Sequence, residues 1–395
     1  MPELAITGVG MASSLSLDVI SSCAAARAGL SRTRDLDLVA FDADAMVSVP
    51  LKGHVAARGL TLGFEGLGRW SQLAEAGLRD LLSYAGLEAH HAARTGLVMN
   101  LPGSTYEDAA RSGDLSDIAD AGLRAQLEAD GDDEQAAARA QVERSFLSTL
   151  PALQEFAAAP TARVIQFGGA ASFVAALEAA RQWLGARVVD RCIVGGIDSK
   201  VDAAALAPFH QLGLARTPSN PVGCFPGEAA AFVLLERPEI ARARGARIEA
   251  TLSAAASANE TGSRFHRRPP APSQAMARAV AQCLTEGSCA AGEVQLSIVN
   301  HNGEQLRAQE VGATWARLSM GGVRLEGQQW FTGQAFGEIG AASGPAAIAM
   351  AVRGLARGYA RSRRVLVMLF DDDEARGAVL VDAASPAAER RSAHG

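Results

Sequence analysis

Short continuous apolar runs alternate with stretches of helical periodicity along nearly the whole chain. In the clearest helical stretch, at about 66–85, Leu67, Trp70, Leu78 and Leu81 recur at steps that place them on one apolar face. Runs of strand length occur at 4–7, 95–100, 162–167, 188–194 and 230–235, and further helices are expected at 16–28 and 170–184. Because the last four runs are apolar throughout, we expect strands buried on both faces of a sheet.

A second series of the same kind begins near residue 247. Its candidate strands are 248–252, 296–300, 365–370 and 378–381, and its candidate helices are 272–285, 304–318 and 341–356. The similar order of elements predicts a duplicated α/β protein with an N-terminal half at 1–245 and a C-terminal half at 246–383. Residues 384–395 have no apolar period, so we expect a disordered tail there.

One segment departs from this pattern. We expect an acidic helical insert at about 104–160, because residues 107–144 hold eleven acids and only four arginines. A solvated helical hairpin explains this composition without a partner, and a docking surface for a basic partner is the sharper alternative. The spacing does not match a calcium-binding EF-hand loop.

Composition excludes several classes of protein. The chain has 395 residues, of which 48% are hydrophobic and 20% charged, as is usual for globular proteins. A net charge of −6 gives no general attraction to nucleic acid, and no apolar run is long enough for a membrane helix. The start of the chain has an acid at Glu3 and no basic segment, so we expect no signal peptide and a cytoplasmic protein.

The sequence does not point to a cofactor or a metal. Gly8-Val9-Gly10 follows the first strand, but Ser13 stands where a dinucleotide-binding motif has its third glycine, so we interpret the segment as a tight strand-to-helix turn. The five cysteines and seven histidines are dispersed without metal-ligand spacing. We therefore expect neither kind of group.

Four glycine-rich turns carry the most information, at 166–173, 222–230, 299–304 and 337–344. In this order and at these separations, with the opening at 6–10 and the segments 179–181 and 194–197, they resemble the β-ketoacyl synthase branch of the thiolase fold. The resemblance extends from about residue 3 to 382. It implies two similar α/β halves in an α-β-α-β-α layered architecture.

The same resemblance places the family's reactive groups on residues that cannot perform their chemistry. The acylated cysteine falls on Gly169, the two histidines on Asn302 and Glu338, and the lysine on Gly333. A carboxylate at Glu338 would repel the anionic intermediate that those groups normally stabilise. We therefore expect no catalytic residue, only these four degenerate positions.

Two other parts of the family's site also differ. The C-terminal glycine loop, which supplies a backbone N–H to the oxyanion hole in the family, is replaced at 370–376 by a segment with four consecutive acids. The threonines that bind the phosphopantetheine arm correspond to Glu304 and Leu306. Cys224 and His301 are the remaining candidates for a reactive pair. We expect Cys224 to be structural, and His301 to point away from the site because it neighbours Asn302.

These features favour a catalytically inactive thiolase-fold protein that acts as a partner, scaffold or accessory. The resemblance implies a homodimer, or a heterodimer with another thiolase-fold protein, paired through residues 161–167. Two settings fit: an accessory of type VI secretion effectors, slightly favoured, or a chain-length-factor-like subunit with an acyl carrier protein as a further partner. The alternative is an active β-ketoacyl-ACP synthase-type acyltransferase of fatty acid or polyketide biosynthesis.

Overall fold

The computed structural model describes residues 3–42, 45–156, 162–265 and 273–384. Its main sheet has ten strands in the order β10-β9-β11-β12-β8-β1-β7-β6-β4-β5. The strands of the first half are β1 Leu4–Ala12, β4 Thr95–Pro102, β5 Arg163–Gly168, β6 Arg191–Ser199 and β7 Glu228–Glu236. Those of the second half are β8 Ala250–Asn259, β9 Val294–Val299, β10 Gln328–Phe331, β11 Arg364–Phe370 and β12 Ala375–Ala383.

The two halves have the same topology. Outward from the centre, the first half runs β1-β7-β6-β4-β5 and the second runs β8-β12-β11-β9-β10. In each half the two inner pairings are antiparallel and the two outer ones parallel. The halves meet where β1 and β8 pair over Leu4–Leu252, Ala5–Thr251 and Ile6–Ala250. This arrangement confirms the predicted fold of two similar α/β halves.

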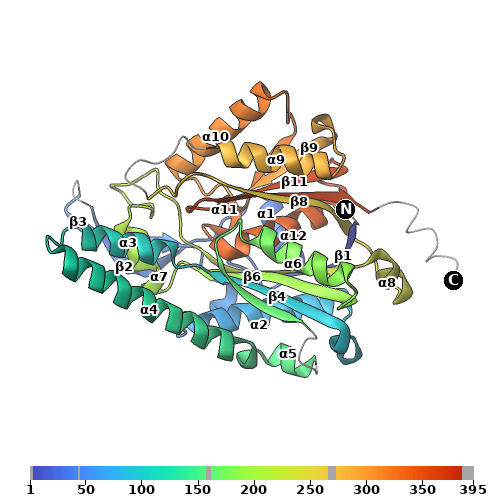
Figure 1. Ribbon diagram of the computed structural model, residues 1–395, viewed down its shortest axis with the longest axis horizontal. Coiled ribbons are helices and arrows are strands. Elements are labelled where there is room, and N and C mark those ends of the chain that lie inside the picture. The colour runs from blue at the N-terminus through green and yellow to red at the C-terminus, as the bar shows by residue number, and fades with distance from the viewer. Residues whose placement is uncertain (1–2, 43–44, 157–161, 266–272, 385–395) are drawn as a thin grey trace.

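Helices lie between the two halves of the sheet and cover their outer faces, as Figure 1 shows. Helix α12, Ser343–Ala356, lies in the middle and is buried on every side from Ser343 to Gly354. A helix that is apolar all round must lie between other layers, and α12 and α6, Phe173–Gly185, both contact strands of both halves. Helix α2, Gly66–Ala85, covers the outer face of the first half; α9, Gln274–Glu286, and α10, Gln305–Met320, lie on that of the second.

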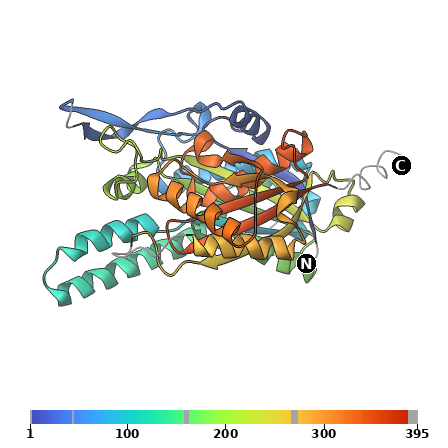
Figure 2. The ribbon, with the colours of Figure 1, turned by 90° about the horizontal axis from the view of Figure 1, so that it is seen from above.

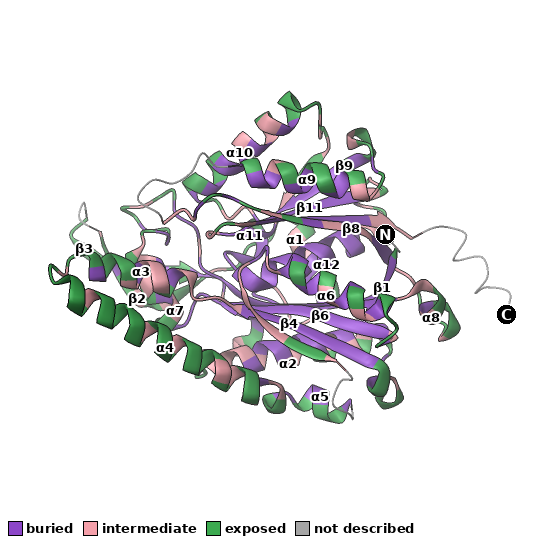
Figure 3. Cartoon of the chain, in the orientation of Figure 1, coloured by how far each residue is buried: buried purple, intermediate pink, exposed green. Residues whose placement is uncertain are grey.

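Strand β7 shows how the sequence produces these layers. Ala230, Phe232 and Leu234 belong to the core under α2, whereas the intervening Ala231 and Val233 belong to the core shared with α6 and α12. The side chains of a strand alternate between faces, so both faces of β7 need apolar residues. Figure 3 shows the central strands of the sheet as buried, and every residue of β7 and β6 is buried.

Two sequence predictions are wrong. Strand β1 continues through Gly8 and Gly10 to Ala12, so there is no tight turn. A Cβ on Gly10 would lie 2.4 Å from the backbone nitrogen of Leu81, so this glycine allows α2 to pack directly against the strand. Strand β5 is not buried on both faces. It lies at the end of the sheet, and Val164 is 36% exposed.

Smaller elements complete the chain. The acidic segment forms two helices, α3 Thr105–Ser116 and α4 Ala121–Ser145, and α4 has no buried residue. Figure 2 shows that this pair and the hairpin of β2, Arg34–Asp42, and β3, Val47–Gly53, extend from the same side of the body. The other helices are α1 Val19–Arg27, α5 Pro151–Glu155, α7 Ala203–Gln211, α8 Pro238–Ala243 and α11 Thr332–Phe336.

The described part of the chain contains no helix with both the length and the apolar character to cross a membrane. The tail predicted at 384–395 lies outside the described residues, except for residue 384.

Candidate functional site

Three of the four positions predicted from the sequence lie on loops, and the fourth, Gly333, lies in the short helix α11. Gly169 follows β5 and precedes α6, Asn302 follows β9, and Gly333 lies in α11 with Glu338 just after it. Asp371 follows β11. Strands β5, β9 and β11 each belong to a parallel pair. The loops that carry Gly169, Asn302 and Asp371 therefore follow the carboxyl ends of parallel strands, where α/β proteins usually place a site.

A carboxylate occupies the position where Gly169 would carry a side chain. A Cβ on Gly169 would lie 2.2 Å from Oδ1 of Asp371, far inside van der Waals contact. The backbone N–H of Ala171 donates to the same oxygen at 3.1 Å. Burial, followed by the nearby Asp373 carboxyl, raises the pKa of Asp371 to about 8. The glycine and the buried carboxyl therefore fit each other, and a nucleophile at residue 169 has no room.

The two residues that the sequence analysis aligned with the family's histidines are joined directly. Nδ2 of Asn302 donates to Oε2 of Glu338 at 2.6 Å, and the backbone N–H of Gly340 donates to Oε1 of Glu338 at 2.9 Å. Glu338 is only 5% exposed, and burial raises its pKa. A Cβ on Gly333 would lie 2.5 Å from Cα of Asn302, so no lysine fits at residue 333 without movement of the backbone.

Two arginines that the sequence analysis did not identify neutralise one of the acids. Arg307 contacts Oδ1 of Asp372 through Nη2 at 2.6 Å, and Arg264 contacts it through Nη1 at 2.9 Å. The hydroxyl of Tyr106 donates to Oδ2 of Asp372 at 2.7 Å. Burial opposes ionisation of Asp372, but Arg307 and Arg264 outweigh it and hold the pKa of this carboxyl well below its usual range. Arg264 also pairs with Glu304 at 3.1 Å.

The prediction that four consecutive acids line the site needs correction. Asp371, Asp372 and Asp373 line the cavity, but Glu374 is exposed. Asp372 is paired, and Asp371 carries a raised pKa, so the lining is less negative than the sequence suggests. The backbone N–H of Asp371 donates to Ala375 at 3.2 Å and is therefore occupied.

A lysine completes the charged network. Nζ of Lys200 lies 3.2 Å from Oδ1 of Asp198 and 4.8 Å from the centre of the Tyr106 ring. Burial disfavours the charged amine, but Asp198 and Glu107 raise its pKa. Neither Lys200 nor the arginines belongs to a recognisable motif, so only the folded chain brings them together. In the sequence, the only sign of this charged network is an excess of charged residues next to the buried strands.

The remaining cavity is very small. Its volume is about 30 Å³, and its lining includes Gly169, Lys200, Arg307, Glu338 and Asp371. This volume holds one or two water molecules, far less than an acyl chain or a thioester arm requires.

Neither alternative reactive residue has suitable surroundings. Cys224 is buried, and burial together with the carboxylates of Glu338 and Asp372 raises the pKa of its thiol well above the usual value. The ring of His301 packs edge-on against Phe331 at 5.3 Å instead of joining Asn302 at the site. The thiol therefore stays protonated, and the imidazole has no thiolate to pair with. Among the residues described, no group of three or more acids, cysteines or histidines could hold a metal ion.

Comparisons with known proteins establish the fold. No family model and no curated protein matches the sequence. The ishigamide ketosynthase/chain length factor matches with a TM-score of 0.70 and 17% identity over 97% of this chain and 100% of that one. The type II polyketide ketosynthase AntDE, solved with its acyl-carrier protein AntF, matches with a TM-score of 0.70 and 14% identity over 97% and 100%.

A third structure, the oxazolomycin ketosynthase domain OzmH KS7, matches with a TM-score of 0.69 and 15% identity over 98% of this chain and 75% of that one. At these identities the likeness concerns the backbone alone. The chain has the thiolase-like fold of ketosynthases.

Proposed function

We propose that this chain is a catalytically inactive ketosynthase-fold protein that acts through a protein partner. The observation that carries the proposal is the position of Asp371, whose carboxylate fills the space of a side chain on Gly169. An acyl transfer of the ketosynthase type needs a nucleophile there and donors that stabilise a developing oxyanion. The site offers a glycine and a buried carboxylate at Glu338 instead.

The chain keeps the core of the ketosynthase fold, which supports a role in binding another protein through its surface. The charged groups of the site bind one another, as in the pairs of Arg307 with Asp372 and Lys200 with Asp198. Such a network needs no substrate to satisfy it, and the hydrogen bond from Tyr106 to Asp372 joins it across the two halves. A protein that keeps its fold while its reactive site is filled in this way is suited to recognition.

The proposed contact is the free edge of β5, Arg163–Gly168. This strand ends the sheet, and Arg163 and Val164 are exposed. An open edge with apolar side chains offers unpaired backbone groups to another strand. We propose that β5 pairs across a two-fold axis, either with a second copy or with another thiolase-fold protein. Thr161, the first residue of the predicted contact, lies outside the described residues.

A chain-length-factor-like role is the preferred setting. One similar structure combines a ketosynthase with a chain length factor, and another holds a ketosynthase with its acyl-carrier protein. We propose a ketosynthase as the partner of this chain, with an acyl carrier protein as a further contact. The role beside type VI secretion effectors stays a prediction of the sequence, because no feature of the described residues favours it.

The direct test is incubation with radiolabelled acyl- and malonyl-thioesters, with an active ketosynthase as the positive control. We expect neither label on the protein nor release of carbon dioxide. Label or release that disappears in Cys224→Ala or His301→Ala would overturn the proposal. Affinity purification from the native cell then identifies the partner. Recovery of a ketosynthase supports the preferred setting, and recovery of a secretion effector instead of a ketosynthase contradicts it.

A further inference from the structure

A second cavity, of about 720 Å³, lies where α1, β10, α11 and the end of α12 meet. It shares no lining residue with the small cavity around Gly169. Its volume lies within the range of pockets that bind small molecules. The proposed loss of activity at the small cavity around Gly169 does not account for this larger cavity.

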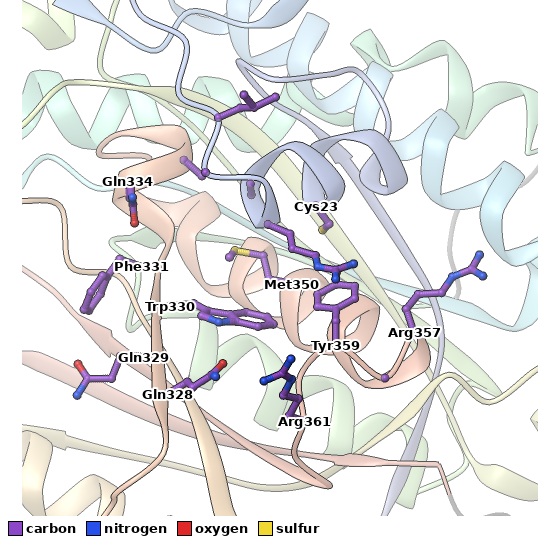
Figure 4. A pocket seen from close by; sticks show the side chains of 16 residues that line it. Cys23, Gln328, Gln329, Trp330, Phe331, Gln334, Met350, Arg357, Tyr359 and Arg361 are labelled. Atoms are coloured by element: carbon purple, nitrogen blue, oxygen red, sulfur yellow. The ribbon is translucent and has the colours of Figure 1, made fainter.

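An aromatic stack forms part of its wall. The rings of Trp330 and Tyr359 are stacked, with centres 5.7 Å apart and planes inclined by 29°. The guanidinium of Arg27 lies 4.4 Å from the centre of the Tyr359 ring. Figure 4 shows Trp330 and Tyr359 side by side, with Arg361 next to them. Aromatic rings and guanidinium planes are the groups on which proteins stack flat heterocycles.

The charge of this cavity contrasts with that of the whole protein. Arg27, Arg357 and Arg361 line it, and no Asp or Glu is among the described lining residues. None of these three arginines forms an ion pair with a described residue. The chain as a whole has a net charge of −6. Three guanidiniums without acids form a local positive site, and guanidinium binds phosphate well because its N–H groups match two phosphate oxygens.

Side-chain amides complete the lining. Gln328, Gln329 and Gln334 line the side of the cavity away from Arg357, and all three are exposed. A glutamine amide both donates and accepts, so it can pair with the edge of a heterocycle. One cavity thus combines stacked aromatic rings, guanidiniums that form no ion pair with a described residue, and side-chain amides.

We propose that this cavity binds a mononucleotide. Its heterocycle would extend the stack of Trp330 and Tyr359, its ring edge would meet the glutamines, and its phosphate would lie between Arg27 and Arg361. This site is separate from the proposed contact at β5, so its test is independent of the proposed function.

Calorimetric titration of the full chain with the 5′-monophosphates of adenosine, guanosine, cytidine and uridine tests the proposal. Adenosine and inorganic phosphate serve as comparison ligands. We expect at least one mononucleotide to bind about tenfold or more tightly than either, because each half of the ligand contributes contacts. Absence of mononucleotide binding, or equal binding of phosphate, would overturn it. Tighter binding of a single-stranded oligonucleotide would also contradict it, because the ligand would then be a polymer.

Substitutions locate the site. Arg361→Gln and Trp330→Leu should each weaken the binding about tenfold, through loss of a charge-assisted hydrogen bond and of stacking. Arg363→Gln is the matched control, because Arg363 is exposed nearby but does not line the cavity. Equal affinities of R361Q and R363Q would place the ligand elsewhere. Circular dichroism of each variant shows whether it is folded, and the wild-type titrations stand if W330L is not.

Discussion

Oδ1 of Asp371 lies 2.2 Å from the point where a Cβ on Gly169 would be. These two residues are 202 positions apart, as 371 − 169, and come from different halves of the chain. Because the carboxyl group also accepts the N–H of Ala171, it is held in that place just before helix α6 begins. The absence of a side chain at residue 169 and the presence of this acid are therefore one structural feature.

This relationship predicts the result of restoring the cysteine. Gly169→Cys should destabilise the protein by about 1–3 kcal/mol, the usual cost of overpacking, because the Asp371 carboxylate must move and release Ala171. In a chain that already carries Asp371→Gly, the added Gly169→Cys should cost much less stability than it does in the wild-type chain. Urea unfolding of all four proteins measures the coupling. Additive effects would show that the two side chains do not compete for the same space.

Protonation of Asp371 should make stability depend on pH. Its pKa in the folded chain is raised to about 8 by burial and by Asp373, whereas an unfolded aspartate titrates near 4. Between these values the folded state binds more protons than the unfolded state, so the free energy of unfolding falls as pH rises from about 4 to about 8. Asp371→Asn should flatten this decline in urea unfolding series. Asp133→Asn, on the exposed face of α4, is the control and should leave the slope unchanged.

The buried ion pairs should contribute strongly to stability. Arg307→Met leaves Asp372 with Arg264 as its remaining charged partner and should cost about 3–5 kcal/mol in the free energy of unfolding. Arg79→Met removes the ion pairs of this half-exposed arginine with Glu75 and Glu155 and should change stability far less, because water screens both pairs. Similar losses in the two variants would refute a structural role for the network.

The edge of β5 should control assembly. Light scattering after size-exclusion chromatography should show a dimer of the purified chain, or of the chain with its thiolase-fold partner. Val164→Arg should convert it to monomer, because pairing across a two-fold axis brings the two new charges together. Val39→Arg is the matched control, since Val39 is an exposed valine of β2. A dimer that persists in V164R but not in V39R would place the contact on the β2–β3 hairpin.

The order of elements and the duplication could be predicted from the sequence, because hydrophobic periodicity directly reports which faces are buried. Helix α2 was predicted at 66–85 and is found at Gly66–Ala85. The apolar run at 162–167 did not show by itself that β5 lies at the edge of the sheet, since such a run does not show whether a neighbouring strand exists. Only the family resemblance pointed to pairing through this strand. The turn predicted at Gly10 was wrong because a glycine needed for helix contact resembles one needed for a turn.

The amino-acid sequence by itself determined that residue 169 has no side chain and that residue 338 is a carboxylic acid, whatever the fold. Together with the family resemblance, these residue types predicted that the reactive groups are missing. Only the tertiary structure decided what replaced them. Arg307 and Arg264 reach Asp372 from distant segments, and Asp371 reaches Gly169 from the other half of the chain. These contacts depend on distances of a few ångströms that no local pattern encodes. Electrostatic and steric effects act between neighbours in space, so the filling of the site emerged only when both halves were folded together.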